Sequence, residues 1–284
     1  MISKLKIYWR LVRLDKPIGI LLLLWPTLWG LFAATDGFPN LHILVVFVLG
    51  TVLMRSAGCA MNDFFDRNVD RHVKRTQDRV LATGSIEPRE ALYVAATLGL
   101  VSLGLVLTTN TLTIKLAIVA AILSITYPLF KRFFAIPQAY LGIAFGFGIP
   151  MSFASIQGEV PLVAWIMLIA NIFWAIAYDT EYAMVDRDDD LRLGIQSSAI
   201  TFGHYDVIFV AISYGLALFL LGIAGDFLGY SWKFFSALSI AAIIAARHIF
   251  WIRNRDRQAC FKAFLHNTWI GATIFLGIAL EVLG

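Results

Sequence analysis

Long stretches without a single charged residue recur along this chain and restrict what it can fold into. Nine such runs occur, and most approach the roughly 20 residues that a helix needs to cross a bilayer: 17–35, 37–54, 91–114, 116–130, 133–158, 160–178, 207–225, 234–246 and 263–280. Only 15% of the residues are charged, against roughly 25% in soluble domains. The pattern predicts an all-α, polytopic membrane protein with about nine transmembrane helices in one bundle.

The shortest run, 234–246, is long enough only when it is extended past Arg247 toward Trp251. This extension is reasonable because an arginine can bury its stem and keep its charged head at an interface or in an internal cavity.

Basic residues are concentrated in every second connection between the apolar runs. Lysine and arginine cluster before the first run and after the second, fourth, sixth and eighth, whereas the other connections carry mainly Asp36, Glu159, Asp226 and Glu281. The positive-inside rule therefore predicts a cytoplasmic N-terminus and cytoplasmic basic connections. This placement accounts for the net charge of +4, so we expect no nucleic-acid partner.

Two of the basic connections also carry acidic stretches. They read MNDFFDRNVD at 61–70 and YAMVDRDDD at 182–190, and each follows an apolar run. Their shared DRxxD pattern recurs at an offset of 120 residues. This repeat predicts an internal duplication, with two parallel four-helix halves, one terminal helix and a site between the halves.

Helical spacing brings the acidic residues onto common faces. Asn62, Asp66 and Asp70 are four residues apart and form one stripe, with Arg55 near it two turns earlier. The second stretch repeats this face with Asp179, Asp186 and Asp190. Carboxylates directed at one space repel each other unless they take up protons or bind a divalent cation.

Oxygen ligands without histidine or cysteine suit Mg²⁺, which completes its shell with water and substrate phosphates. The predicted ligands are Asn62, Asp66, Asp70, Asp186 and Asp190. Cations are also needed for the rest of a phosphorylated ligand, and the candidates are Arg67, Lys74, Arg75, Lys131 and Arg132.

Two other interpretations compete with this site. One mixed-sign stretch alone is explained better by a solvated, salt-bridged loop, but two copies at matching positions reverse this preference and favour a site. A divalent-cation transporter also carries ionisable groups inside its bundle. A conduit would need polar residues through the outer half of the membrane, and the first, third and fifth runs offer almost none. The histidines show no metal-ligand spacing and receive no role.

Three motifs resemble the UbiA superfamily of intramembrane aromatic prenyltransferases. They are NDxxDxxxD at 62–70, YxxxK at 127–131 and YDxxYAxxDxxxD at 178–190. The resemblance runs nearly end to end, which implies one prenyltransferase domain over 1–284. It is strongest to the bacterial 4-hydroxybenzoate polyprenyltransferases of ubiquinone synthesis. One departure follows Asp78 and Arg79, where Val80 stands in place of the family's proline, and we expect it to loosen this loop.

The resemblance implies that a polyprenyl group passes from polyprenyl diphosphate to the ring carbon beside the hydroxyl of 4-hydroxybenzoate, with Mg²⁺ as cofactor. Another aromatic acceptor is the alternative. The isoprenoid tail would lie in an apolar tunnel open to membrane lipid, and the site would face the cytoplasm from a bacterial inner membrane. The implied catalytic acids are Asp66, Asp70, Asp186 and Asp190. The implied substrate-binding residues are Arg67, Lys74, Tyr127, Lys131, Arg132, Tyr178, Asp179 and Tyr182, with Arg132 directed at the acceptor's carboxylate.

Overall fold

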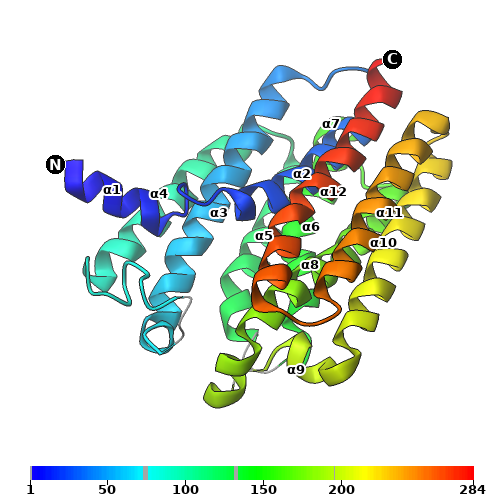
Figure 1. Cartoon of the computed structure of the whole chain (residues 1–284). Helices are drawn as coiled ribbons and strands as arrows, with labels where there is room; N and C mark the ends of the chain where they lie inside the picture. Colours follow the sequence, from blue (N-terminus) through cyan, green and yellow to red (C-terminus); the bar gives the residue numbers. More distant parts are fainter. Residues whose placement is uncertain (1, 73–75, 131–133, 195) are drawn as a thin grey trace.

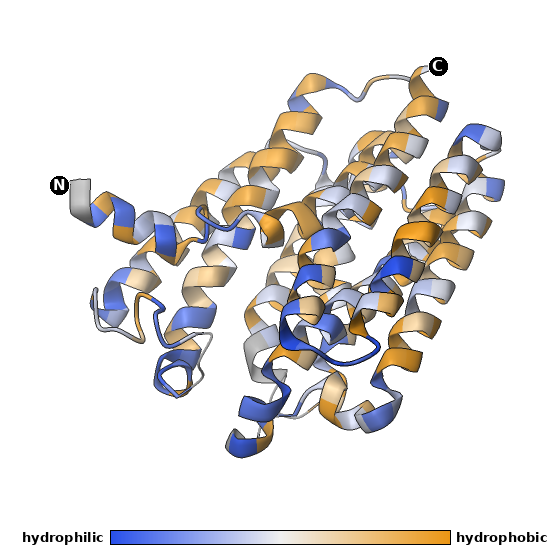
Figure 2. Ribbon diagram, in the orientation of Figure 1, coloured by the Kyte–Doolittle hydropathy of each residue, from blue (hydrophilic) through white to orange (hydrophobic). Residues whose placement is uncertain are grey.

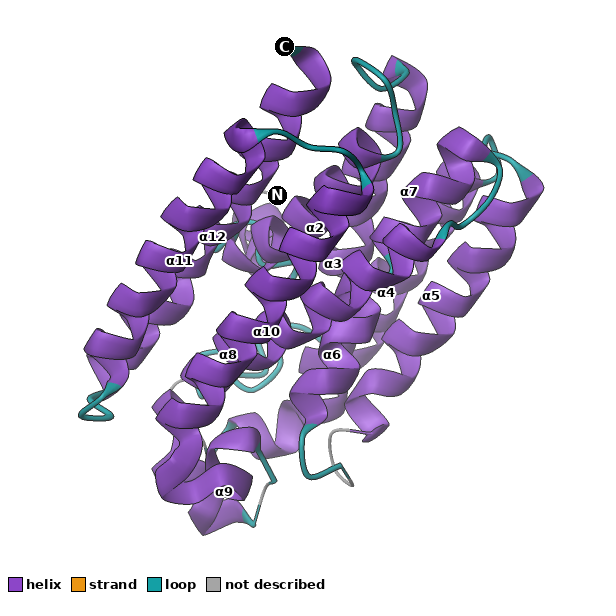
Figure 3. Ribbon diagram, turned by 90° about the vertical axis from the view of Figure 1, so that its right-hand side faces the viewer, coloured by secondary structure: helices purple, strands orange, loops and turns teal. Residues whose placement is uncertain are grey.

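The computed structural model describes residues 2–72, 76–130, 134–194 and 196–284, and every regular element in these ranges is helical (Figures 1 and 3). The elements are α1 (Ile2–Leu11), α2 (Ile18–Ala33), α3 (Leu41–Asp70), α4 (Pro88–Val106), α5 (Thr111–Phe130), α6 (Pro137–Gly146), α7 (Gly148–Gln157), α8 (Leu162–Leu193), α9 (Ser198–Phe202), the 3₁₀ turn η1 (Gly203–Tyr205), α10 (Asp206–Phe227), α11 (Trp232–Ile252) and α12 (Arg257–Leu283). The prediction of an all-α fold is confirmed.

The apolar runs coincide with the helices of the bundle. Within the described ranges, seven helical segments are long and apolar enough to cross a membrane, and α2 and α5 are shorter apolar helices. The protein is therefore an integral, multi-pass membrane protein, while the count of nine crossings stays a prediction. As expected, α11 continues through Arg247 to Ile252, and the Arg247 guanidinium lies 4.9 Å from the centre of the Trp251 ring.

Helix α8 lies at the centre of the larger part of the core, where it packs against α6, α7, α10 and α12. Helix α2 is attached to α12 by two indole hydrogen bonds. Trp29 Nε1 donates to the Gly271 carbonyl at 2.9 Å, and Trp25 Nε1 donates to Thr268 Oγ1 at 2.9 Å. A second apolar cluster joins α1 to α3, α4 and the segment 80–86, so the N-terminal helix lies beside the C-terminal half of α3.

The two motif helices are longer than the others. At about 1.5 Å per residue, their 30 and 32 residues give roughly 45 Å, more than the ~30 Å of a hydrocarbon core. Each helix therefore continues beyond an apolar span as rigid structure and carries its acidic motif there. Their C-terminal ends lie at the same, lower end of the bundle in Figure 1, where Figure 2 shows many hydrophilic residues.

The run 133–158 contains the break that its glycines and proline suggest. Helix α6 ends at Gly146 and α7 begins at Gly148, with Phe147 between them. Gly142 brings α6 close to α8, because a Cβ atom there would stand 2.7 Å from the Ile172 Cα atom. Small residues of this kind allow close helix packing in membranes.

Gly142→Ala is therefore expected to lower the thermal unfolding midpoint of the purified protein, since the added methyl group would meet backbone that cannot move without separating α6 from α8. Gly104→Ala in α4 is the matched control, because a Cβ atom there meets nothing within 4 Å. Replacing a glycine inside a helix by alanine gains about 0.5–1 kcal/mol when space allows. Equal midpoints for the two variants would contradict the close approach.

Candidate active site

A cavity of about 1080 Å³ runs along α3, where its lining extends from Val46 to Asp63. Its walls come from helices far apart in the sequence, including α2, α4, α5, α8 and α12. Charged side chains line the part nearest α1, namely Arg10, Arg13, Asp15, Lys16, Asp63, Asp78 and Arg79, and apolar side chains of α4 and α5 line much of the rest. This arrangement suits a ligand with an anionic head and an apolar tail.

Five of the residues predicted from the motifs line this cavity: Asn62, Tyr127, Tyr178, Asp179 and Tyr182. The Tyr127 hydroxyl lies within electrostatic range of Asp66 on α3 and of Asp179 on α8. Residues from the two motifs, more than 100 positions apart in the sequence, therefore both come close enough to one tyrosine to interact with it electrostatically.

Four polar atoms in this lining have unmet hydrogen-bonding capacity: Arg55 Nε, Asp63 Oδ2, Asn62 Oδ1 and the Tyr178 hydroxyl. All four are buried and have no hydrogen-bond partner among the described residues. Buried polar atoms without partners are uncommon in native structures, so these atoms mark where a ligand or an ion would be bound. Tyr182 presents an aromatic face to the same cavity, with its ring stacked on Phe264 at a centroid distance of 4.4 Å.

The four predicted catalytic acids lie outside the cavity lining. Asp70 and Asp186 are buried, with 6% and 7% of their surface exposed, and Asp66 and Asp190 are half-buried. Within the described part of the chain, no three acidic, histidine or cysteine side chains form a ready metal site. Carboxylates that repel each other are expected to stay apart without a cation. The donor set, which is all oxygen and includes the unpartnered Asn62 Oδ1, still fits Mg²⁺.

Two arginines that were not predicted as site residues are paired with acids of α3 at the charged end of the cavity. Arg13 Nη2 lies 2.9 Å from Asp63 Oδ1. Arg79 Nη1 lies 2.8 Å from Asp70 Oδ2 and 3.4 Å from Asp63 Oδ1. Asp63 is 1% exposed, and an unpaired charge at such a position would be costly. The signal available in the sequence was the position of Asp63, directly after Asn62 in the first motif.

The same pairs hold the loop that follows the first motif. Arg79 ties this loop to Asp63 and Asp70, and its neighbour Val80 is buried with Leu81 and Ile86 in the second apolar cluster. We expected the missing proline to loosen the loop. Apolar packing and ion pairs hold Arg79 and Val80 in the described part of this loop, and a looser loop stays a prediction.

Not all predicted cations lie at the cavity. Arg67 bends back along α3, where its Nη1 donates to the Phe64 carbonyl and its guanidinium lies 4.6 Å from the centre of the Phe64 ring. It is not part of the cavity lining. Lys74, Arg75, Lys131 and Arg132 lie outside the described residues, so their roles stay predictions.

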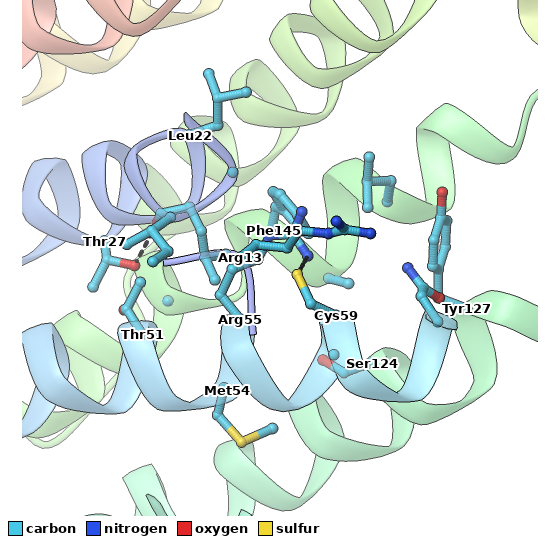
Figure 4. A pocket seen from close by; sticks show the side chains of 18 of the residues that line it. Arg13, Leu22, Thr27, Thr51, Met54, Arg55, Cys59, Ser124, Tyr127 and Phe145 are labelled. Atoms are coloured by element: carbon cyan, nitrogen blue, oxygen red, sulfur yellow. Dashed lines mark hydrogen bonds between the residues drawn. The ribbon is translucent and has the colours of Figure 1, made fainter. Parts of the chain in front are cut away.

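Arg55 is a cation inside the cavity that was expected near the first stripe but had no predicted role. It is half-buried on α3, two turns before Asn62, and lines the cavity (Figure 4). Its Nη1 lies 2.8 Å from Cys59 Sγ, and its guanidinium lies 5.5 Å from the centre of the Phe145 ring. Its Nε is buried without a hydrogen-bond partner among the described residues. A guanidinium with such an unused donor is suited to bind a carboxylate.

Gly19 of α2 makes room for this side chain. A Cβ atom at position 19 would stand 2.5 Å from Arg55 Nη2 and 2.7 Å from its Nε. The position of the guanidinium in the cavity thus depends on the absence of a side chain at residue 19.

The wall that α4 and α5 form is also a surface of the protein. Leu103, Ile118, Ile122 and Ile125 line the cavity, and between 45% and 59% of the surface of each is exposed. The cavity therefore reaches the apolar flank of the bundle, where the membrane supplies the surrounding medium.

Comparison with known proteins agrees with this arrangement. Residues 23–270 match the UbiA prenyltransferase family. The chain is 60% identical over 276 residues to a 4-hydroxybenzoate octaprenyltransferase of Methylobacillus flagellatus, which covers 97% of this chain and 93% of the relative. Among solved structures, a UbiA homologue from Aeropyrum pernix K1 superposes with a TM-score of 0.80 at 22% identity, covering 93% of this chain and 98% of the other. A UbiA homologue from Archaeoglobus fulgidus bound to GPP and Mg²⁺ gives 0.74 at 19% identity, covering 98% and 99%.

Proposed function

Because the chain belongs to the UbiA prenyltransferase family, we propose that it transfers a polyprenyl group from a polyprenyl diphosphate to 4-hydroxybenzoate in ubiquinone biosynthesis. The new bond forms at the ring carbon beside the hydroxyl, and diphosphate is released. The near-full-length similarity to a relative of this activity supports the choice of acceptor. The observation that carries the proposal is the cavity, which joins residues of both motifs to an apolar compartment.

The anionic head of the donor would bind at the charged end of the cavity. Asn62, Asp66, Asp70, Asp186 and Asp190 would hold Mg²⁺, which when bound neutralises charge on the departing diphosphate. The Tyr127 hydroxyl lines the same space and can donate a hydrogen bond to a diphosphate oxygen. Arg13 and Arg79 are preplaced cations at this end, and fixed charges of this kind favour ionisation of the allylic C–O bond.

The acceptor would bind deeper along α3. The Arg55 guanidinium takes the carboxylate, a role predicted from the sequence for Arg132, and the ring lies among Phe145, Tyr178 and Tyr182, which also line the cavity. As the allylic C–O bond breaks, its electron pair leaves with the diphosphate and the ring carbon bonds to the allylic carbon. The proton on that ring carbon then passes to the Asp179 carboxylate, which lines the same cavity.

The isoprenoid tail would follow the apolar side chains of α4 and α5. Walls of this kind also keep water from the allylic cation. The conduit interpretation fits less well, because this lining is apolar where an ion path would need polar groups. Basic residues at the charged end of the cavity, including Arg10 and Lys16, support a site that faces the cytoplasm from a bacterial inner membrane.

Removal of divalent cations is expected to abolish product formation. The protein, reconstituted in lipid vesicles, would receive a polyprenyl diphosphate and 4-hydroxybenzoate with Mg²⁺, with chelator, and with chelator followed by excess Mg²⁺. Mass analysis should find the prenylated acid only in the first and third samples. Equal product in chelator would contradict the proposed metal site.

The same assay with a mixture of aromatic acids tests the acceptor, because the product mass identifies which acid was used. If another acid were prenylated and 4-hydroxybenzoate were not, the proposed acceptor would be wrong, but the proposed prenyl transfer reaction would stand. Movement of Mg²⁺ across the vesicles without any product would favour a transporter.

A further inference from the structure

A second polar cluster is buried in the C-terminal half of the bundle, outside the lining of the cavity. It joins Glu181 of α8, Tyr214 of α10, His248 of α11 and Asn267 of α12, and none of the four is more than 3% exposed. Ionisable groups inside a membrane bundle are expensive and usually functional. None of these residues lines the cavity, and the reaction described above does not use them.

The hydrogen bonds of this cluster have a defined direction. The indole Nε1 of Trp174 can only donate, and it lies 3.0 Å from Asn267 Oδ1. This contact fixes the Asn267 amide, so its Nδ2 must donate to Glu181 Oε2, at 2.8 Å, and to the Ala263 carbonyl, at 3.1 Å. Glu181 is therefore required as an acceptor at this oxygen.

The other branch of the cluster also ends on Glu181. The Tyr214 hydroxyl lies 2.9 Å from Glu181 Oε1 and 2.8 Å from Asn267 Oδ1, and its single hydrogen is donated to one of these two oxygens. Its oxygen is then free to accept from His248 Nδ1 at 3.1 Å. We assign His248 the tautomer protonated at Nδ1, which leaves its Nε2 to accept from His266 Nδ1 at 3.0 Å. Side chains of α10 and α12 thus contact one carboxyl group of α8, and α11 joins them through Tyr214.

This cluster lies directly behind the acceptor side of the cavity. At 100° per residue, Glu181 is about 160° around α8 from Asp179 and about 100° from Tyr182, and both of these residues line the cavity. Trp174 contacts Tyr178 edge to face at 5.2 Å. On α12, Asn267 lies one turn after Phe264, which stacks on Tyr182. The cluster thereby fixes the rotation of α8 and its register with α12.

We propose that Glu181, Tyr214, His248 and Asn267 are positioning residues that hold Tyr178, Asp179 and Tyr182 in place for the aromatic acceptor. The proposal rests on the proposed function. A positioning role predicts different effects on the two substrates, whereas general stabilisation of the fold does not. The reason is that the described hydrogen bonds of the cluster tie α8 to α10, α11 and α12 and do not reach α3. Loss of the cluster should therefore weaken acceptor binding and leave binding of the prenyl diphosphate largely unchanged.

The test compares Tyr214→Phe and Glu181→Gln with a matched control. Tyr214→Phe removes the hydroxyl that links Glu181, Asn267 and His248. Glu181→Gln replaces one of the two carboxyl oxygens that contact Tyr214 and Asn267 with an amide nitrogen, which cannot accept a hydrogen bond. Tyr230→Phe is the control, since its hydroxyl is also buried in this half of the bundle but has no hydrogen-bond partner among the described residues. For each variant, calorimetry gives the acceptor Kd, with 4-hydroxybenzoate as the ligand, and steady-state assays give kcat together with the acceptor KM and the donor KM.

In the two cluster variants, we expect the acceptor Kd to rise about ten-fold or more, because small misplacements of positioning groups have large effects. The donor KM should stay within about two-fold, and the control should match the parent protein. A lower unfolding midpoint with unchanged acceptor Kd would overturn the proposal and leave the cluster a structural role. Equal increases in the acceptor KM and the donor KM would also overturn the proposal. Failure of the parent protein to use 4-hydroxybenzoate at all would instead count against the proposed function.

Hydrogen exchange on the unmodified protein keeps the proposal testable if the variants do not fold. Bound 4-hydroxybenzoate should slow amide exchange in 174–185 and 263–267, the segments that the cluster joins, more than a bound prenyl diphosphate does. No difference between the two ligands in these segments would overturn it.

Discussion

Asp66→Asn and Asp186→Asn are each expected to lower prenyl transfer on the order of 100- to 1,000-fold, the scale seen when one preorganised electrostatic group is lost from an active site. Each change removes a negative charge and almost no volume. Asp66 belongs to α3 and Asp186 to α8. A lower rate of prenyl transfer in both variants would therefore show that the two motif helices act on one diphosphate. The measurement is kcat/KM for the prenyl diphosphate over a range of Mg²⁺ concentrations.

Asp188→Asn is the control for this pair, because Asp188 is an exposed residue of the same acidic stretch. It removes the same charge two positions from Asp186, and turnover should stay close to that of the parent protein. Normal turnover in Asp66→Asn or Asp186→Asn would count heavily against the proposed site. A loss accompanied by a higher Mg²⁺ requirement would assign the residue to the ion, and a loss without that shift would assign it to the substrate.

Arg55→Gln is expected to raise the acceptor KM on the order of 10- to 100-fold, since a hydrogen bond to a charged group contributes about 1.5–3 kcal/mol. The guanidinium lines the cavity beside Phe145, and the glutamine would leave the carboxylate of 4-hydroxybenzoate without a cation. The donor KM should change much less. The decisive comparison uses a phenol without the carboxylate, for which the parent protein and Arg55→Gln should perform alike.

Arg247→Gln is the control for the loss of an arginine within a membrane helix, because Arg247 contacts Trp251 and does not line the cavity. Gly19→Ala tests the same assignment without removing the charge. Its methyl group would displace the end of the Arg55 side chain, so it should raise the acceptor KM in the same direction. If Arg55→Gln has the acceptor KM of the parent protein, the carboxylate of 4-hydroxybenzoate must be bound by Arg132 or another cation instead.

The fold was largely predictable because the bilayer imposes a length on each helix. Uncharged runs located the helices, and the extension of α11 through Arg247 was also foreseen. The sequence could not show how far α3 and α8 continue as helices beyond their apolar runs, because the charged stretch 62–70 suits a solvated loop and a helix equally well. Nor could it show that α2 and α12 are joined through Trp29 and Gly271, which depends on tertiary packing.

The motif residues that line the cavity could be predicted from the sequence, whereas the position of a single side chain outside the motifs was hard to predict. Asn62, Tyr178, Asp179 and Tyr182 stand in motifs, and all line the cavity. Arg55 was missed as a site residue because nothing about a lone arginine in an apolar run separates a ligand-binding group from one that reaches the interface. The ion pairs of Arg79 were missed because basic residues after a membrane helix usually reflect topology alone.

Some side chains of α4 and α5 form both the cavity wall and the protein surface. This affects which concentration of each substrate determines the rate of this enzyme. A long prenyl donor reaches such a wall by diffusing in the plane of the bilayer, so its effective concentration is its mole fraction in lipid. The small aromatic acid arrives from water and follows its bulk concentration. Adding inert lipid to vesicles at a constant total amount of donor should therefore slow the reaction, as a lower donor concentration would. The acceptor KM, expressed as a concentration in water, should stay the same.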